Sequence, residues 1–307
     1  MGDFSAHWLA LREPADHRSR SEALVRALIL WMEEQPRPGL LSVLDLGAGA
    51  GSNLRYLAPL IGGQQRWTCV DKDPELLKAL RVQTAAWAIA RGLIATADGA
   101  EQRILGQGID WRVATPYMDL AAGADNFPLA PGTLVVASAL MDLVSESWLA
   151  ELLRACWRGQ SPLLASLNYD GRVELSPHEP LDGLVIALVN GHQGRDKGLG
   201  PALGPSGPRA LARLGRRLGY QARTASSDWE LDPDQTGIQE ALIAGWGHAA
   251  RVQVRDAFGG SAGAIDPRIE SIDHWQDVRL GHVAAGRSCL RVGHEDLLLL
   301  PSTPRTR

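Results

Sequence analysis

Long apolar runs are absent from this 307-residue sequence, which excludes a membrane-spanning helix. Uninterrupted apolar stretches such as residues 27–32 and 297–300 are far short of the roughly 20 residues that cross a bilayer. Asp3, Arg12 and Glu13 stand near the start, where a secretory signal would have a basic and then an apolar segment. We therefore expect a cytoplasmic protein that does not associate with membranes.

Cysteine is scarce and acidic residues outnumber basic ones, and each of these observations argues against one class of site. Cys69, Cys156 and Cys289 form no Cys-x-x-Cys pair, so we expect no metal site and interpret all three as buried structural residues. The 31 basic residues are outnumbered by 35 acidic ones, and the formal net charge is -4. Domains that bind nucleic acid are normally basic, so we do not expect a nucleic-acid partner.

Short apolar segments alternate with helical patterns along most of the chain. Seven strands are expected, at residues 40–46, 66–70, 109–113, 133–139, 162–167, 220–225 and 289–300. Helices are expected at residues 74–91, 146–157, 209–218, 234–254 and 269–285. This alternation predicts an α/β fold, a doubly wound and mostly parallel seven-stranded sheet with helices on both faces. We assign residues 1–38 to an N-terminal helical cap and residues 39–307 to the main domain.

Residues 168–208 interrupt the alternation. They are rich in Gly, Pro and polar side chains and contain one possible helix, at residues 181–189. Long irregular segments in a folded domain are usually functional. We therefore interpret residues 168–208 as a loop-rich insert after strand five that binds the substrate.

A glycine-rich turn follows the first expected strand and is the most informative motif. Its sequence is Asp45-Leu46-Gly47-Ala48-Gly49-Ala50-Gly51. Residues without a Cβ allow a tight turn and the close approach of a ligand to the backbone. The next strand ends at Asp71, 20 residues after Gly51, where a carboxylate can accept hydrogen bonds from both ribose hydroxyls. This spacing predicts a nucleoside site.

The glycine spacing and Asp45 also restrict the rest of the ligand. Dinucleotide-binding turns have the pattern G-x-G-x-x-G, whereas the third glycine here comes one residue earlier. A carboxylate two residues before the first glycine repels a diphosphate and suits a cationic group. We expect a nucleoside with a positive end; an NAD(P)-dependent oxidoreductase and a catalytically silent nucleoside-binding module remain the alternatives.

On these residues the chain resembles the class I S-adenosylmethionine-dependent methyltransferases, in which an acidic residue precedes G-x-G-x-G and a second acidic residue ends the next strand. The resemblance implies S-adenosylmethionine as the cofactor. It implies that Gly47, Ala48 and Gly49 line the methionine portion, that Asp45 helps to hold its amino group and that Asp71 binds the ribose. The remaining cofactor candidates are Gly51, Lys72, Asp119 near the adenine and Ser138.

The end of the fourth expected strand, residues 137–142, lies beside the transferable methyl group by the same resemblance. It contains no Asn-Pro-Pro-Tyr type of signature, which weakens the case for methylation of nucleic acid or of glutamine. Ser138 is expected to line the pocket. Asp142 either lies there too or caps the following helix.

The acceptor is expected to bind beyond the carboxyl ends of the strands, where the insert begins. Candidate catalytic residues are Tyr169, Asp170 and His192, and candidate substrate-binding residues are Arg172, Asn190, Arg195 and Lys197. This set suits methyl transfer to an oxygen or nitrogen of a small polar, anionic molecule. In the alternative interpretation, the arginines form local ion pairs with Asp170 and Asp196 that fix a long loop. The oligomeric state is left open.

The N-terminal segment offers one further hypothesis. Residues 8–18 are interpreted as a lid over the donor site, with Arg18 or Arg20 reaching the carboxylate of the donor. Simple packing of a helix against the main domain is the alternative.

Overall fold

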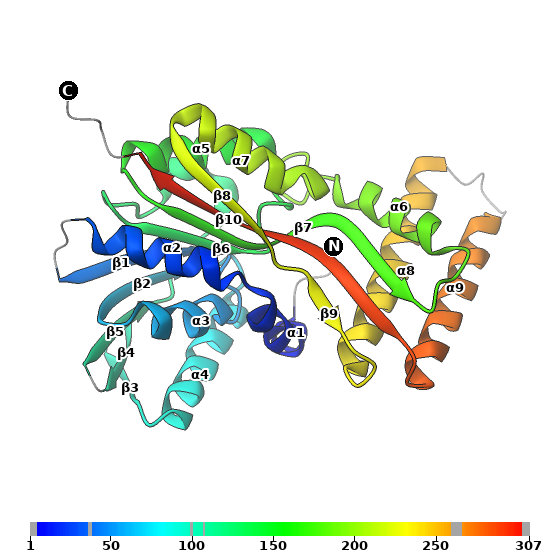
Figure 1. Cartoon of the computed structure of the whole chain (residues 1–307), viewed down its shortest axis with the longest axis horizontal. Helices are drawn as coiled ribbons and strands as arrows, with labels where there is room; N and C mark the ends of the chain where they lie inside the picture. The colour runs from blue at the N-terminus through cyan, green and yellow to red at the C-terminus, as the bar shows by residue number, and fades with distance from the viewer. Residues whose placement is uncertain (1–4, 36–38, 99–100, 107, 259–265, 303–307) are drawn as a thin grey trace.

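A ten-stranded sheet forms the centre of the described part of the protein (Figure 1). The computed structural model describes residues 5–35, 39–98, 101–106, 108–258 and 266–302. Along the sheet the strand order is β3-β4-β5-β2-β1-β6-β7-β10-β8, and β9 pairs with β10. The strands are β1 (Leu40–Leu46), β2 (Gln64–Val70), β3 (Ile94–Asp98), β4 (Glu101–Gly106), β5 (Ile109–Ala114), β6 (Leu134–Ser138), β7 (Leu163–Ser176), β8 (Tyr220–Ser226), β9 (Trp229–Leu231) and β10 (Cys289–Pro301).

Nine α-helices and three short 3-10 helices accompany the sheet in the described residues. The α-helices are α1 (Ala6–Ser19), α2 (Glu22–Glu33), α3 (Ser52–Ile61), α4 (Pro74–Ala90), α5 (Glu146–Arg158), α6 (Asp182–Gln193), α7 (Gly207–Leu218), α8 (Thr236–Phe258) and α9 (Pro267–Ala284). The 3-10 helices are η1 (Leu120–Ala122), η2 (Ala124–Asn126) and η3 (Gly204–Ser206). Of the described helices, none combines the length and apolar character needed to span a membrane.

The α/β class and the mostly parallel sheet are confirmed, but the expected number of seven strands is wrong. All seven expected strands are present, and β3, β4 and β9 are additional. β3 and β4 form an antiparallel hairpin beside β5 at one edge of the sheet. Their five and six residues mix polar and apolar types, so they lack the continuous apolar run of a buried strand.

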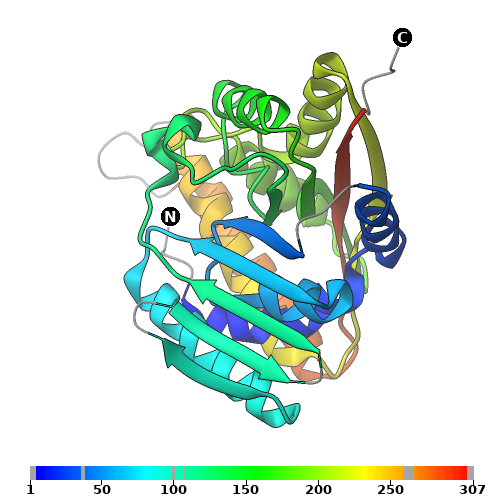
Figure 2. The same ribbon diagram turned by 90° about the vertical axis from the view of Figure 1, so that its left-hand side faces the viewer.

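Helices cover the two faces of the sheet and enclose two apolar cores (Figure 2). On one face, Leu28 of α2, Leu57 of α3 and Leu80 of α4 pack with alternate strand residues. On the other face, α5 and α7 pack through residues that include Leu149 and Leu211. The three cysteines do not share one environment, because Cys69 and Cys156 are buried whereas Cys289 is exposed, contrary to expectation.

The long antiparallel strands β7 and β10 extend beyond the rest of the sheet and carry a second group of helices (Figure 1). We call this part the side lobe: α6, α8, α9, β9 and the adjoining halves of β7 and β10. Its own apolar core includes Trp246 and Trp275. Arg279 of α9 forms a buried ion pair with Asp182 of α6, which fixes these two helices to each other.

The side lobe corrects the interpretation of residues 168–208. The segment is not loop-rich over most of its length, because β7 continues to Ser176 and α6 covers Asp182–Gln193. Beyond Tyr169, burial in β7 alternates between partly buried and exposed residues. A strand with one solvated face contains many polar residues and therefore resembles a loop in sequence.

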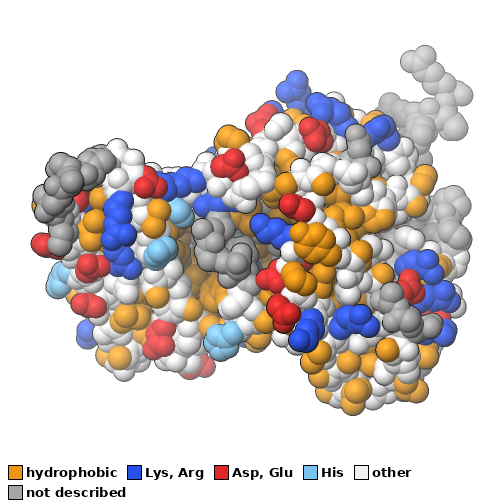
Figure 3. All heavy atoms as spheres, turned by 180° about the vertical axis from the view of Figure 1, so that it is seen from behind, with side chains coloured by type: hydrophobic (Ala, Val, Ile, Leu, Met, Phe, Trp, Pro, Cys, Tyr) orange, Lys and Arg blue, Asp and Glu red, His pale blue; other side chains and the backbone are white. Residues whose placement is uncertain are grey.

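Helix α1 lies between the sheet and the side lobe, where it contacts α3, α4, β9 and α8. His17 of α1 hydrogen-bonds through Nε2 to Ser52 Oγ of α3 at 3.0 Å. Arg55 of α3 forms an ion pair with Glu13 of α1. Viewed from behind, the surface is hollowed between the sheet and the side lobe, with hydrophobic, acidic and basic side chains along the hollow (Figure 3).

Candidate active site

The glycine-rich turn after β1 is fixed against the end of β2. Gly47, Gly49 and Gly51 have φ values of 65°, 51° and 86°, a backbone conformation that strains other residue types. The amide of Gly49 donates a hydrogen bond of 2.9 Å to Asp71 Oδ2. The acidic residue at the end of β2 therefore lies directly beside the turn, as the sequence spacing predicts.

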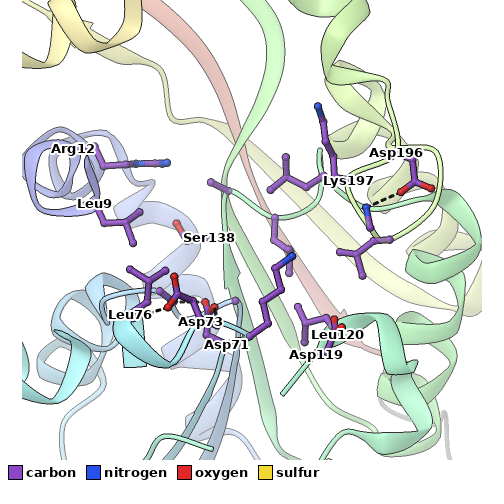
Figure 4. Close-up of a pocket in the computed structure, with 18 residues that line it drawn as sticks. Leu9, Arg12, Asp71, Asp73, Leu76, Asp119, Leu120, Ser138, Asp196 and Lys197 are labelled. Carbon is purple, nitrogen blue, oxygen red and sulfur yellow. Dashed lines mark hydrogen bonds between the residues drawn. The ribbon is translucent and has the colours of Figure 1, made fainter. Parts of the chain in front are cut away.

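A cavity of about 420 Å³ opens beside this turn, at the carboxyl ends of β1, β2 and β6 (Figure 4). Such a position, where neighbouring connections leave a central strand in opposite directions, is where parallel α/β sheets bind ligands. The lining residues are Leu9, Arg12, Gly47, Gly49, Asp71, Lys72, Asp73, Leu76, Asp119, Leu120, Ser138, Ala139, Leu140, Leu143, Asp196, Lys197, Gly198 and Leu199.

One end of the cavity is acidic. Asp71 and Asp73 lie side by side there, and Asp119 lies apart from them beside Leu120, as Figure 4 shows; Lys72, between Asp71 and Asp73 in the chain, also lines the cavity. Asp71 Oδ1 accepts a hydrogen bond of 3.0 Å from the amide of Asp73, whose own side chain caps α4. Asp119 Oδ1 accepts from the amide of Ala121 at 2.9 Å. The carboxylates of this end are thus oriented by the backbone around them.

The expected cofactor residues divide into two groups in the structure. Those that line the cavity are Gly47, Gly49, Asp71, Lys72, Asp119 and Ser138, whereas Asp45, Ala48 and Gly51 do not line it. Gly51 caps the start of α3, and a Cβ on it would come within 2.7 Å of Leu80 Cγ. Its function in the structure is close packing between α3 and α4.

Asp45 lies behind the turn and is 1% exposed. Its Oδ1 accepts a hydrogen bond of 2.9 Å from Asn53 Nδ2, and its Oδ2 has no partner among the described residues. Burial raises the pKa of Asp45 to about 7. The carboxyl group of Asp45 therefore lies behind the turn, bound to Asn53 and outside the cavity lining.

Arg20 links this buried carboxyl group to the cavity. Its guanidinium donates to Asn53 Oδ1 at 2.6 Å and to Ser138 Oγ at 3.1 Å, and it lies 4.8 Å from the ring centroid of Tyr56. Burial lowers the pKa of Arg20. Of the two arginines in the lid hypothesis, Arg20 is thus beside a cavity residue, whereas Arg18 is exposed.

The end of β6 contains an unusual backbone conformation at the cavity wall. Ala139 has a φ of 52°, and Leu167 in the adjacent β7 has a φ of 56°. Residues other than glycine adopt this region at an energetic cost, and such residues concentrate at functional sites. Asp142 follows within the same connection and does not cap α5, because that helix is capped by Ser145. Burial raises the pKa of Asp142 to about 6.

The three expected catalytic residues lie outside the cavity lining. The hydroxyl of Tyr169 donates to Asn190 Oδ1 at 2.7 Å, so both residues join β7 to α6. Asp170 forms an exposed ion pair with Arg172 at 2.5 Å. His192 lies in the last turn of α6, where burial and then Lys197 lower its pKa to about 4.

Of the four expected substrate-binding residues, Lys197 lines the cavity and the others do not. Arg172 pairs with Asp228 as well as with Asp170, which agrees with the alternative interpretation of local ion pairs. Arg195 pairs with Asp256 of α8 and not with Asp196. Ion pairs between segments distant in sequence cannot be read from local patterns.

Sequence reasoning placed residues 8–18 over the site but missed the apolar wall of the cavity and the two residues, Leu9 and Arg12, that α1 contributes to the lining. Leu76, Leu140, Leu143 and Leu199 line the cavity but have the pattern of ordinary core residues. Leu9 and Arg12 fall within the expected lid segment, yet nothing in the sequence distinguishes them from their neighbours. Among the described residues, no group of three or more His, Cys, Asp or Glu side chains is arranged to hold a metal ion.

No protein-family model and no curated protein match the chain. Solved structures similar to it include a cyclopropane-fatty-acyl-phospholipid synthase-like protein from Lactobacillus casei, at 13% identity and a TM-score of 0.49, covering 96% of this chain and 94% of that one. Another is an arsenic (III) S-adenosylmethionine methyltransferase from Chlamydomonas reinhardtii, at 16% identity and a TM-score of 0.41, covering 92% and 74%.

A third similar structure is phosphoethanolamine N-methyltransferase 2 from Haemonchus contortus, in complex with phosphomonomethylethanolamine and S-adenosylhomocysteine. The identity is 11% and the TM-score 0.42; the match covers 98% of this chain and spans 59% of the length of that protein. The structural neighbours of the chain thus include S-adenosylmethionine-dependent methyltransferases. At such low identities and TM-scores, an activity has to be argued from the site itself.

Proposed function

We propose that the chain is a class I S-adenosylmethionine-dependent methyltransferase that modifies an oxygen or nitrogen of a small polar metabolite. One observation carries the proposal: Asp71 holds the amide of Gly49 at a cavity that Gly47 and Asp119 also line. A carboxylate at this position suits ribose hydroxyls, and the open glycine backbone allows the methionine portion to approach closely.

The charges at the acidic end favour a cationic donor over a dinucleotide. A diphosphate needs free amides at a helix N-terminus, which here would be that of α3. Helix α1 lies against that terminus, because His17 bonds to both Ser52 O and Ser52 Oγ, and Gly51 packs against Leu80. This packing argues against the NAD(P)-dependent alternative.

The chemistry that the site would support is an in-line displacement. Bound S-adenosylmethionine supplies an electrophilic methyl group, and the chain chiefly has to align the acceptor with it. In this proposal Asp71 and Asp119 bind the nucleoside, and Ser138, held by Arg20, lies toward the methyl group. The apolar side chains of Leu140 and Leu143 exclude water from the region of transfer.

Calorimetric titration tests the donor assignment and one residue within it. We expect S-adenosylmethionine and S-adenosylhomocysteine to bind and NAD not to bind. Asp71→Ala removes the carboxylate that fixes Gly49 and faces the ribose, and it should weaken donor binding by about 1 to 3 kcal/mol. Asp110→Ala, which removes a carboxylate at the distant β4–β5 pair, is the matched control and should leave the affinity unchanged.

Unchanged donor affinity in Asp71→Ala would contradict the placement of the ribose. Binding of NAD in preference to S-adenosylmethionine would contradict the whole proposal. The silent-module alternative has its own signature, which is donor binding without any methylated product when labelled donor is incubated with a fractionated cell extract.

A further inference from the structure

The two ends of the cavity have different charge. The end that contains Asp71, Asp73 and Asp119 is acidic, as described above. At the other end, Arg12 and Lys197 approach from opposite walls, and Ser138 lies between the two ends (Figure 4). If the nucleoside occupies the acidic end, the cationic end is left to the acceptor.

Arg12 is held rigidly by contacts that leave its outer nitrogen unused. Its Nε donates to Asp16 Oδ2 at 2.9 Å and its Nη2 to Asp16 Oδ1 at 3.1 Å. The guanidinium also lies 4.9 Å from the ring centroid of Trp229, whose Nε1 donates to Asp16 at 3.1 Å. Arg12 Nη1 has no hydrogen-bond partner in the described chain, and the guanidinium points into the cavity (Figure 4).

Lys197 supplies a second cation from the loop after α6. Its Nζ donates to the carbonyl of His192 at the end of α6 at 3.2 Å, so one of its three protons is used. No ion pair joins Lys197 to a carboxylate of the described residues. The neighbouring Asp196 accepts from the amide of Gly198 through Oδ1, and the buried Asp142 interacts electrostatically with both Lys197 and Arg12 without an ion pair to either.

We propose that Arg12 and Lys197 bind an oxyanion, a carboxylate or a phosphate group, of the methyl acceptor. This rests on the proposed function, because the acidic end must hold the donor. A guanidinium fixed on its Nε side by Asp16 presents its outer N–H groups to a second carboxylate or phosphate. Arg12 is then a specificity-determining residue that selects anionic acceptors, and Trp229 and Asp16 are its positioning residues.

Anion titrations with variants test this inference directly. The protein is loaded with S-adenosylhomocysteine and titrated at constant ionic strength with inorganic phosphate and, separately, with acetate. We expect saturable binding of at least one anion, weakened about tenfold in Arg12→Gln and in Lys197→Met, because each variant loses a charge-assisted hydrogen bond. Arg26→Gln, on the exposed face of α2, is the matched control and should behave as the wild type.

Donor titrations of the same two variants distinguish failure of this inference from failure of the donor assignment. We expect the affinity for S-adenosylmethionine to change less than about threefold in both variants. A loss of donor affinity in Arg12→Gln with unchanged anion binding would overturn the inference, since Arg12 would then serve the donor. Failure of both anions to bind the wild type would overturn it as well. Absence of donor binding to the wild type would instead refute the proposed function.

The functional groups of the methylated product provide a second readout. After incubation of the wild type with labelled donor and a cell extract, the labelled product should contain a carboxylate or phosphate group when it is identified by mass spectrometry. Arg12→Gln should label it at least about tenfold less efficiently. A product without a carboxylate or phosphate group would contradict the inference even if methyl transfer itself is observed.

Discussion

Asp45 and Asp71 come from neighbouring strands, yet the structure gives them different functions. Asp71 lies at the cavity and orients the glycine turn through Gly49. Asp45 is buried, hydrogen-bonded to Asn53 and outside the cavity lining. The resemblance in sequence implied a ligand contact for both residues; for Asp45 that remains a prediction which the geometry does not support.

The buried environment of Asp45 gives a pH-dependent prediction. Its pKa of about 7 lies above the ordinary value for an aspartate, so ionisation costs free energy in the folded state. The cost is absent below pH 4 and grows as the pH rises to 7. Relative to the wild type, Asp45→Asn should therefore gain about 1 to 3 kcal/mol of unfolding free energy between pH 4 and pH 8.

Urea unfolding at several pH values measures this difference. Asp110→Asn is a control of opposite sign, because the hydrogen bond from Arg103 lowers the pKa of Asp110. That variant should become less stable relative to the wild type as the pH rises through the range where Asp110 ionises. A pH-independent difference for Asp45→Asn would show that this carboxyl group is not desolvated as described.

At the scale of elements, α1 and the glycine turn form one unit. A Cβ on Gly49 would approach Leu9 Cδ1 of α1 to 2.9 Å, so the turn and the helix are in direct contact. Helix α1 also supplies Arg12 to the cavity wall. The proposed donor site therefore depends on an element that precedes the first strand by about 20 residues.

Gly49→Ala tests the contact between α1 and the turn. The new methyl group would displace Leu9, and alanine is strained at a φ of 51°, so donor affinity should fall about tenfold or more. Adding Leu9→Ala removes the clash but not the strain and should restore part of the affinity. Gly62→Ala is the matched control, since Gly62 has a φ of 67° but no atom within 4 Å of its Cβ position.

Donor titrations of the four proteins give the answer. Wild-type affinity in Gly49→Ala would mean that α1 moves away from the turn without consequence for the donor. Equal losses in Gly49→Ala and Gly62→Ala would mean that backbone strain, and not the contact with Leu9, determines the effect.

At the scale of the whole molecule, the sheet and the side lobe were predictable to different degrees. The parallel strands β1, β2, β5 and β6, the inner half of β7 and the glycine turn could be predicted because buried parallel strands are short apolar runs and positive φ values favour glycine. The outer half of β7 could not, because it pairs with β10 more than a hundred residues later and exposes one face. Its polar sequence resembles a loop until that pairing is known.

The residues that line the cavity also divide into those that the sequence could predict and those that it could not. Asp71, Lys72 and Ser138 were predictable, because they follow or end strands that converge at one edge of the sheet. Leu9 and Leu199 reach the cavity only through the placement of α1 and of the loop after α6. Such contacts depend on tertiary packing between distant segments, which local periodicity does not encode.

The central claim is that the adenosyl donor binds in the cavity that the glycine turn and Asp71 line side by side, and a crystal structure of the complex with S-adenosylhomocysteine tests it most directly. We expect the ribose hydroxyls within hydrogen-bonding distance of the Asp71 carboxylate and the amino-acid portion along Gly47 and Gly49. Electron density for the ligand elsewhere, or a ribose directed away from Asp71, would contradict the account.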